Sequence, residues 1–116
     1  MQKMEEKLKI ENKPPTAILT AEDIFEETVA EVLQEVFGRI AKEALIRMMA
    51  DLSQRPERTV LRDPKIINFC LLGLFGSGAK VLERMILLKL NENGFVEIDP
   101  YGDFLEELEK IGLVRG

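Results

Sequence analysis

Residues 63–90 have the sequence DPKIINFCLLGLFGSGAKVLERMILLKL, and this stretch decides the class of fold. Asp63-Pro64 places a capping carboxylate before a proline, which is the favoured order at the start of a helix. Apolar side chains then cover every side of Pro64–Phe75, a pattern typical of a core helix surrounded by protein. Gly76-Ser77-Gly78 predicts a tight turn in which Gly76 takes a left-handed conformation and Ser77 caps the next helix.

The residues that follow predict two further helices. Ala79–Leu90 combines a broad apolar face with charged positions, which predicts an amphipathic helix ended by Asn93-Gly94. Phe95–Ile98 alternates apolar and acidic residues but has no partner strand, so we expect irregular structure there. Asp99-Pro100 repeats the capping pattern ahead of a short final amphipathic helix that Gly112 stops; its apolar residues are Phe104, Leu105, Leu108 and Ile111.

The first helical signal begins at Thr20, an N-cap hydroxyl followed by acidic residues in the first turn. From there apolar residues recur at a spacing of four as far as Met48/Met49. This spacing advances by about 40° per step, so the apolar stripe drifts around the helix. An unbroken helix to Leu52 would be about 50 Å long, against a radius of gyration near 13 Å for a compact domain of this size. Either the helix breaks near Gly38, or it projects into a second subunit.

These elements predict an all-α fold: a small bundle of about four or five helices with a long or broken first helix. Ser53–Arg62 contains Pro56 and lacks helical periodicity, which predicts a loop. Consecutive prolines at 14 and 15 separate a polar N-terminal tail, residues 1–17, from a single helical domain, residues 18–116.

Composition narrows the classes of function. The chain has no histidine, which removes the commonest general base and the commonest zinc ligand. Its single cysteine, Cys70, lies in an apolar run, where we expect a free buried thiol. We therefore predict a protein that is not an enzyme, with no catalytic residue, no cofactor and no metal.

The same composition bears on location. Hydrophobic residues make up 46% of the chain and charged residues 32%, as in a globular protein. No charge-free apolar run approaches the roughly 20 residues that span a bilayer. The N-terminal residues mix lysine and glutamate without the apolar region of a secretory signal. We expect a cytoplasmic protein without membrane contact.

Charge is unevenly placed along the chain. Ala21–Phe37 carries acidic residues and no basic ones, whereas basic residues outnumber acidic ones in Gly38–Lys65. Two copies can pair these segments in a symmetric antiparallel dimer. We therefore predict a homo-oligomer, preferably a dimer, in which the interface residues are Leu33, Phe37, Ile40, Leu45 and Met48. If the chain is a monomer, the stripe folds back and a groove for another protein partner becomes the better prediction.

Two segments suggest binding chemistry, each beside a simpler interpretation. Gly76–Lys80 superficially resembles a phosphate loop but lacks the Walker spacing and follows a helix, so we favour an interhelical turn, with anion binding by Ser77 and Lys80 as the alternative. The basic residues from Arg47 to Lys65 can contact phosphates or an acidic partner. Nucleic acid is disfavoured because no aromatic residues that would stack on bases are interleaved with them.

The stretch Ile40–Asn91 resembles a small family of archaeal helical domains, the Nitrosopumilus output domains at the effector ends of predicted signalling proteins. The likeness is carried by residues 41–44 (AKEA), Asp63-Pro64, and above all residues 74–86 (LFGSGAKVLERMI). It implies an archaeal, helical and non-enzymatic regulatory role, and it supplies no catalytic residues.

The sequence thus favours a non-enzymatic helical interaction domain that acts as a homo-oligomer in regulation or signalling. The alternative is a DNA-binding regulator of the winged-helix type, suggested by the pattern of residues in Leu108–Val114. Against that alternative stand the net charge of −5 and the acidic Glu106, Glu107 and Glu109, where a recognition helix would face phosphates.

Overall fold

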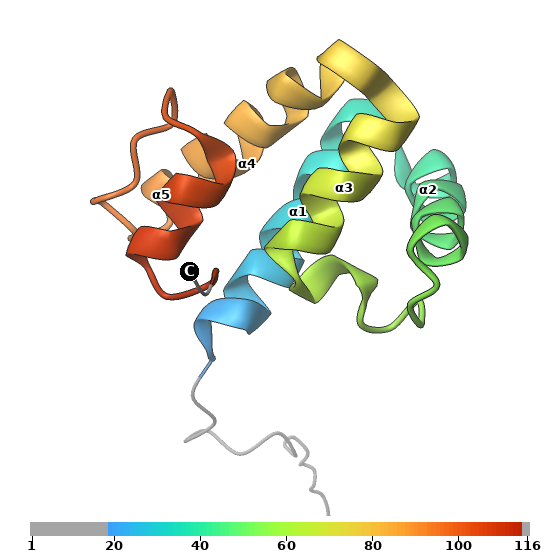
Figure 1. Cartoon of the computed structure of the whole chain (residues 1–116), viewed down its shortest axis with the longest axis horizontal. Helices are drawn as coiled ribbons and strands as arrows, with labels where there is room; N and C mark the ends of the chain where they lie inside the picture. The colour runs from blue at the N-terminus through green and yellow to red at the C-terminus, as the bar shows by residue number, and fades with distance from the viewer. Residues whose placement is uncertain (1–18, 115–116) are drawn as a thin grey trace, which may run out of the picture.

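The computed structural model describes residues 19–114, and Figure 1 shows its helical arrangement. Within these residues the chain forms five α-helices and two short 3-10 turns and no strand, so the predicted all-α fold is confirmed. The elements in chain order are α1 (Ala21–Phe37), α2 (Arg39–Ser53), η1 (Val60–Arg62), α3 (Pro64–Phe75), η2 (Gly76–Gly78), α4 (Ala79–Glu92) and α5 (Phe104–Lys110). The predicted N-terminal tail, residues 1–17, lies outside the described residues.

Two helices begin at the caps that the sequence predicts. At the start of α1, Asp23 N donates to Thr20 Oγ1 at 3.0 Å while Thr20 N donates to Asp23 Oδ2 at 3.0 Å, forming a reciprocal capping box. At the start of α3, Lys65 N donates to Asp63 Oδ1 at 2.9 Å, and Pro64 occupies the first turn. These bonds confirm both predicted helix starts. The starts were predictable because each cap forms between residues that are close in the sequence.

The break that separates α1 from α2 falls at Gly38. Its φ of +87° and ψ of 165° lie in a region that is essentially closed to residues with a Cβ atom. The chain changes direction there, and α2 packs against α1. Of the two alternatives that the sequence left open, the structure has the break, and the drifting apolar stripe is divided between two shorter helices.

The helices enclose one hydrophobic core. α1 contacts α2 and α4, while α3 contacts α2, α4 and α5. In Figure 1, α2 and α5 therefore lie at opposite ends of the bundle, with α1 and α3 between them. The largest fully buried side chains come from all five helices and from the 93–103 segment: Phe25, Val29, Val32, Leu33, Met49, Ile67, Leu71, Ile86, Leu87, Leu90, Ile98 and Leu108.

The prediction that α3 is surrounded by protein is wrong. Ile67, Cys70 and Leu71 are buried, but Phe69 is 54% exposed and Leu72 is 48% exposed. The neighbouring helices cover only one side of α3, because the bundle is too small to place a helix on every side of it. The expected buried thiol is confirmed: Cys70 is free, and its Sγ donates to Met49 O at 3.5 Å.

Two local predictions near helix ends are also wrong. Ser77 makes no capping bond: the turn Gly76–Gly78 leads directly into α4, whose N-cap position is Gly78. The final helix is capped by Asp103, which accepts from Glu106 N, whereas Asp99 accepts from Tyr101 N within the preceding loop. In each case a nearer residue occupies the cap position, and sequence alone did not distinguish the two.

Part of the predicted loop Ser53–Arg62 is built into the core. α2 continues to Ser53, and Val60 and Leu61 are buried in the turn η1. Arg62 Nη1 donates to Asp23 Oδ1 and to Glu26 Oε1, both at 2.8 Å, and so links η1 to α1. The backbone N–H of Thr20 and the Arg62 guanidinium lower the pKa of Asp23 to about 2. An acidic and a basic segment thus pair within one chain.

We expect this link to make stability depend on acid pH. Because the pKa of Asp23 is lower in the folded chain than its usual 3.8, its contribution to stability is present above about pH 4 and lost as the pH falls through about 2. Arg62→Gln should flatten this decline, since it removes the guanidinium that helps to lower the pKa of Asp23. Urea unfolding measured across this pH range checks the prediction, with Arg58→Gln as the control because Arg58 is exposed and has no ion pair among the described residues. Equal pH profiles for the wild type and Arg62→Gln would contradict it.

Candidate functional site

A continuous apolar surface runs along α2 and onto α3. On α2, exposed apolar residues recur every four positions; on α3, two large apolar side chains are about half exposed. Positions four apart on a helix are neighbours, so the α2 residues form one stripe. We call this surface the α2–α3 face, and it consists of Ile40, Ala44, Met48 and Leu52 from α2 with Phe69 and Leu72 from α3.

The two parts of the α2–α3 face meet at Gly73. A Cβ atom added to Gly73 would lie 3.1 Å from Leu52 Cδ2, so α2 approaches the α3 backbone closely at this point. Phe69 lies one turn before Gly73 on α3, which places it on the side of α3 that Leu52 approaches, and Leu72 is the neighbour of Phe69 three positions along the helix. Large exposed apolar groups gathered over two helices are a recurrent feature of protein-binding surfaces.

The five predicted interface residues take different places. Ile40, which is 80% exposed, and Met48 lie on the α2–α3 face. Phe37 and Leu45 are half-buried beside the core, and the Phe37 ring stacks on Phe75 at 5.4 Å between centroids. Leu33 is only 1% exposed, inside the core of a single chain, so its prediction as an interface residue is wrong. Leu33 belongs instead to the buried cluster that the helices of one chain form together.

Charged residues border the α2–α3 face in a regular row. Glu43, Arg47 and Asp51 are exposed, each four positions from the next, and their charges alternate in sign. Within residues 19–114, the ion-pair partner of these three is Glu57, whose Oε2 lies 3.7 Å from Arg47 Nε, with both side chains more than half exposed. Pairs of this kind contribute little to stability, so the row is available to an outside partner.

A second candidate site is a polar hollow of about 300 Å³ between α4 and α5. Its wall on α4 carries Lys80, Glu83, Arg84 and Leu87; the wall opposite is formed by Pro100, Tyr101, Gly102, Asp103 and Phe104. The volume is at the small end of the range found for ligand pockets. Two acidic and two basic side chains therefore converge on a space of the size of a small metabolite.

Glu83 is the unusual residue in this hollow, because it is only 8% exposed and its carboxyl group lacks an ion pair among the described residues. Asn68 Nδ2, from α3, donates to Glu83 Oε2 at 2.6 Å. No hydrogen bond from the described part of the chain reaches Oε1. Burial raises the pKa of Glu83, and Asp103 adds to the rise, while the bond from Asn68 opposes it. Titratable groups perturbed in this way occur often at functional sites.

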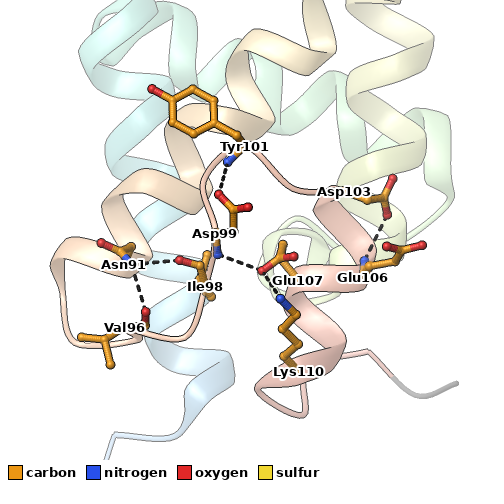
Figure 2. A network of polar contacts seen from close by, with 9 residues as sticks. All are labelled: Asn91, Val96, Ile98, Asp99, Tyr101, Asp103, Glu106, Glu107 and Lys110. Atoms are coloured by element: carbon orange, nitrogen blue, oxygen red, sulfur yellow. Dashed lines mark hydrogen bonds and ion pairs between the residues drawn. The ribbon is translucent and has the colours of Figure 1, made fainter.

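The loop that forms the outer wall is held in place by a polar network, shown in Figure 2. Asn91 Nδ2 donates to Ile98 O at 2.9 Å, and Asp99 N donates to Glu107 Oε1 at 2.8 Å. Lys110 Nζ donates to the same Glu107 oxygen at 2.9 Å. The bonds from Asp99 N and Lys110 Nζ lower the pKa of Glu107. The loop is thereby fixed from both α4 and α5.

This fixed loop presents Tyr101, which is 76% exposed, beside α4. The guanidinium carbon of Arg84 lies 4.9 Å from the centre of the Tyr101 ring, a cation–π arrangement. Close packing also explains Gly102: a Cβ atom there would lie 2.5 Å from Glu107 Oε2. Sequence reasoning missed this wall, since its network joins residues from three separate segments.

The anion site predicted from the sequence is only partly assembled. Lys80 lines the polar hollow, but Ser77 is not among the lining residues. Lys80 instead lies near Glu83 and Arg84, positions three and four residues further along α4, which share one side of the helix. No group of three histidine, cysteine, aspartate or glutamate residues suited to a metal ion occurs within residues 19–114.

One stretch, Pro64–Glu92, is long and apolar enough to cross a membrane if only length and composition are considered. Core helices of soluble proteins meet the same criteria, and 33% of its apolar window is buried. Here the stretch forms two helices, α3 and α4, joined by the turn Gly76–Gly78. The expectation that the chain makes no membrane contact stays a prediction.

Comparison of the chain with protein-family models, with curated proteins and with solved structures found no match. The resemblance to the Nitrosopumilus output domains therefore stays a prediction from residues 40–91.

Proposed function

We propose that this protein is a non-enzymatic interaction domain that forms a homodimer through the α2–α3 face. The observation that carries the proposal is the gathering of Met48, Leu52, Phe69 and Leu72, each about half exposed, at one place on the surface. Burying such side chains is the main driving force of association between proteins.

A second copy is the occupant that the charges favour. The row Glu43, Arg47 and Asp51 borders the stripe. If two α2 helices pack antiparallel with their centre near Met49, Arg47 of each copy lies opposite Asp51 of the other. A two-fold axis forms this pair twice, which gives the face complementarity to itself.

The size of the surface predicts a weak dimer. Stable interfaces bury about 800 Å² on each partner, and a patch of a few large side chains supplies only the apolar centre of such an area. We therefore expect a dissociation constant in the micromolar range and a mass that rises with concentration. The regulatory and signalling role, the archaeal origin and the cytoplasmic location belong to the same proposal, and they rest on the resemblance and on composition.

The DNA-binding alternative is less well supported. A winged helix needs a β-hairpin, and residues 19–114 contain no strand. In addition, Arg62 is engaged by two carboxylates, Asp23 and Glu26, which reduces the positive charge that the central segment offers to phosphates.

The test of the proposed interface is the Phe69→Asp variant. A charge at the centre of an apolar interface should weaken dimerisation by more than about tenfold and leave the fold intact, because Phe69 is exposed in the monomer. Light scattering after size exclusion, over a wide concentration range, should give a mass approaching twice 13.2 kDa for the wild type and 13.2 kDa for the variant. Val96→Asp is the matched control, since Val96 is also highly exposed but lies in the 93–103 loop. A wild type that is monomeric throughout, or a Phe69→Asp variant that still dimerises, would contradict the proposal.

A further inference from the structure

The polar hollow between α4 and α5 is independent of the proposed dimer surface and has the features of a built site. Its lining includes Glu83, a residue that is more than nine-tenths buried and whose carboxyl group has one oxygen without a hydrogen bond from residues 19–114. A buried acceptor that lacks a donor is costly, so a group from outside the chain would stabilise it.

The charges around the hollow limit what that outside group is. Lys80 and Arg84 are exposed and lie three residues before and one residue after Glu83 on α4. A ligand that is only anionic would face Glu83 and Asp103, and a ligand that is only cationic would face Lys80 and Arg84; each would meet repulsion. A molecule with one charge of each sign satisfies both pairs.

From this arrangement we infer that the hollow binds a small zwitterion, an α-amino acid, with its ammonium group on Glu83 and its carboxylate between Lys80 and Arg84. The volume of about 300 Å³ accommodates a molecule of this size. Guanidinium groups bind carboxylates through two parallel hydrogen bonds, which suits Arg84 to the carboxylate end.

The walls suit a ligand site because they are largely fixed before binding. Glu107 holds the backbone of Asp99, and Asn91 holds that of Ile98, so the loop needs little ordering when the ligand enters. Tyr101 and Pro100 supply apolar surface for the side chain of the amino acid. The inference thus assigns to the chain a metabolite-binding site in addition to its proposed interaction surface.

The experiment titrates the full ¹⁵N-labelled chain with each free α-amino acid separately and follows the backbone amide signals. We expect at least one amino acid to shift the signals of Lys80, Glu83, Arg84 and Tyr101 in a saturable manner. The N-acetylated form of that amino acid, which lacks the ammonium charge, should lose this binding. Absence of any saturable shift at about 10 mM, or equal binding of the acetylated form, would overturn the inference.

Variants test the two ends of the ligand separately. Glu83→Gln keeps the size of the side chain and its acceptor for Asn68, and it should weaken binding by about tenfold or more. Lys80→Gln, at an exposed position where folding is not at risk, should weaken binding of the same amino acid by a few fold. Glu97→Gln removes an exposed carboxylate from the same loop and should leave binding unchanged. Equal affinity of the wild type and Glu83→Gln, with the circular dichroism of both intact, would overturn the assignment of the ammonium site.

Discussion

Leu33→Asp is expected to abolish folding of the chain. Leu33 is 1% exposed and lies among the buried side chains that α1 contributes to the core. A carboxylate placed there has no partner and must either lose its hydration or be protonated, and a buried unpaired charge costs about 3 to 5 kcal/mol or more. Since a domain of this size has a total stability of about 5 to 15 kcal/mol, most of it would be lost. Circular dichroism and thermal unfolding measure the outcome directly.

The matched control for this prediction is Val36→Asp. Val36 lies one turn further along the same helix but is partly exposed, so the same chemical change should cost less than about 1 kcal/mol. Leu33→Ala should give an intermediate loss of about 2 to 5 kcal/mol from the cavity alone. If Leu33→Asp instead stayed folded and merely lost self-association, Leu33 would be an interface residue after all. The burial of this side chain in the core of a single chain would then be wrong.

Features that depend on adjacent residues were predictable from the sequence. The starts of α1 and α3 follow from Thr20 with Asp23 and from Asp63 with Pro64, since each cap forms between residues at most three apart. The Asp99-Pro100 and Ser77 predictions used the same reasoning and were wrong. There the chain offered a competing residue close by, and only the three-dimensional path of the loop selects one of them.

Exposure was less predictable than helix position. An apolar run shows that Pro64–Phe75 is helical and contributes to the core, but it does not show how many neighbours cover that helix. Phe69 and Leu72 were therefore expected inside and lie outside. Conversely, Val60 and Leu61 were assigned to a loop and are buried, because a 3-10 turn carries them into the core. The position of the α2–α3 face depends on which residues form the helices and also on which neighbours cover each helix.

The polar hollow had almost no signal in the sequence. Lys80 was singled out, but its predicted companion Ser77 is a neighbour in the chain and not in the site. The hollow is lined by Glu83 and Arg84 on α4 and by Tyr101 in the following loop, and Asn68, which binds Glu83, comes from a third element, α3. A buried glutamate within an amphipathic helix looks like any exposed one until its neighbours are known.

The structure also gives a different explanation for the separation of acidic and basic residues along the sequence. The acidic first helix and the basic central segment suggested pairing between two copies, but Arg62 pairs with Asp23 and Glu26 of its own chain. This pairing is possible because the chain turns at Gly38 and again in the loop after α2. The fold of the single chain thus uses part of the charge complementarity within the monomer.

The second large expected effect concerns the helix break at Gly38: Gly38→Ala should convert the chain into an exchanged dimer. At φ +87° and ψ 165° a Cβ atom is strained even though nothing lies within 4 Å of it, and such strain costs about 1 to 3 kcal/mol. The alanine relieves it by continuing the helix, which merges α1 and α2 into one helix from Ala21 to Ser53, about 50 Å long. Met49 and Ala50 then lose their partners in the same chain and recover them from a second copy.

Gly112→Ala separates this effect from backbone strain alone. Gly112 also has a positive φ, +83°, and open space around it, but it lies beyond α5 and joins no two helices. Gly112→Ala should lower stability and leave the mass unchanged. Gly38→Ala should give a dimer that dissociates slowly and persists when Phe69→Asp is added, because the exchange re-forms the core contacts of the monomer between two chains and does not use the α2–α3 face. A Gly38→Ala chain that stays monomeric and is only less stable would show that the interhelical turn is held by more than the conformation of one glycine.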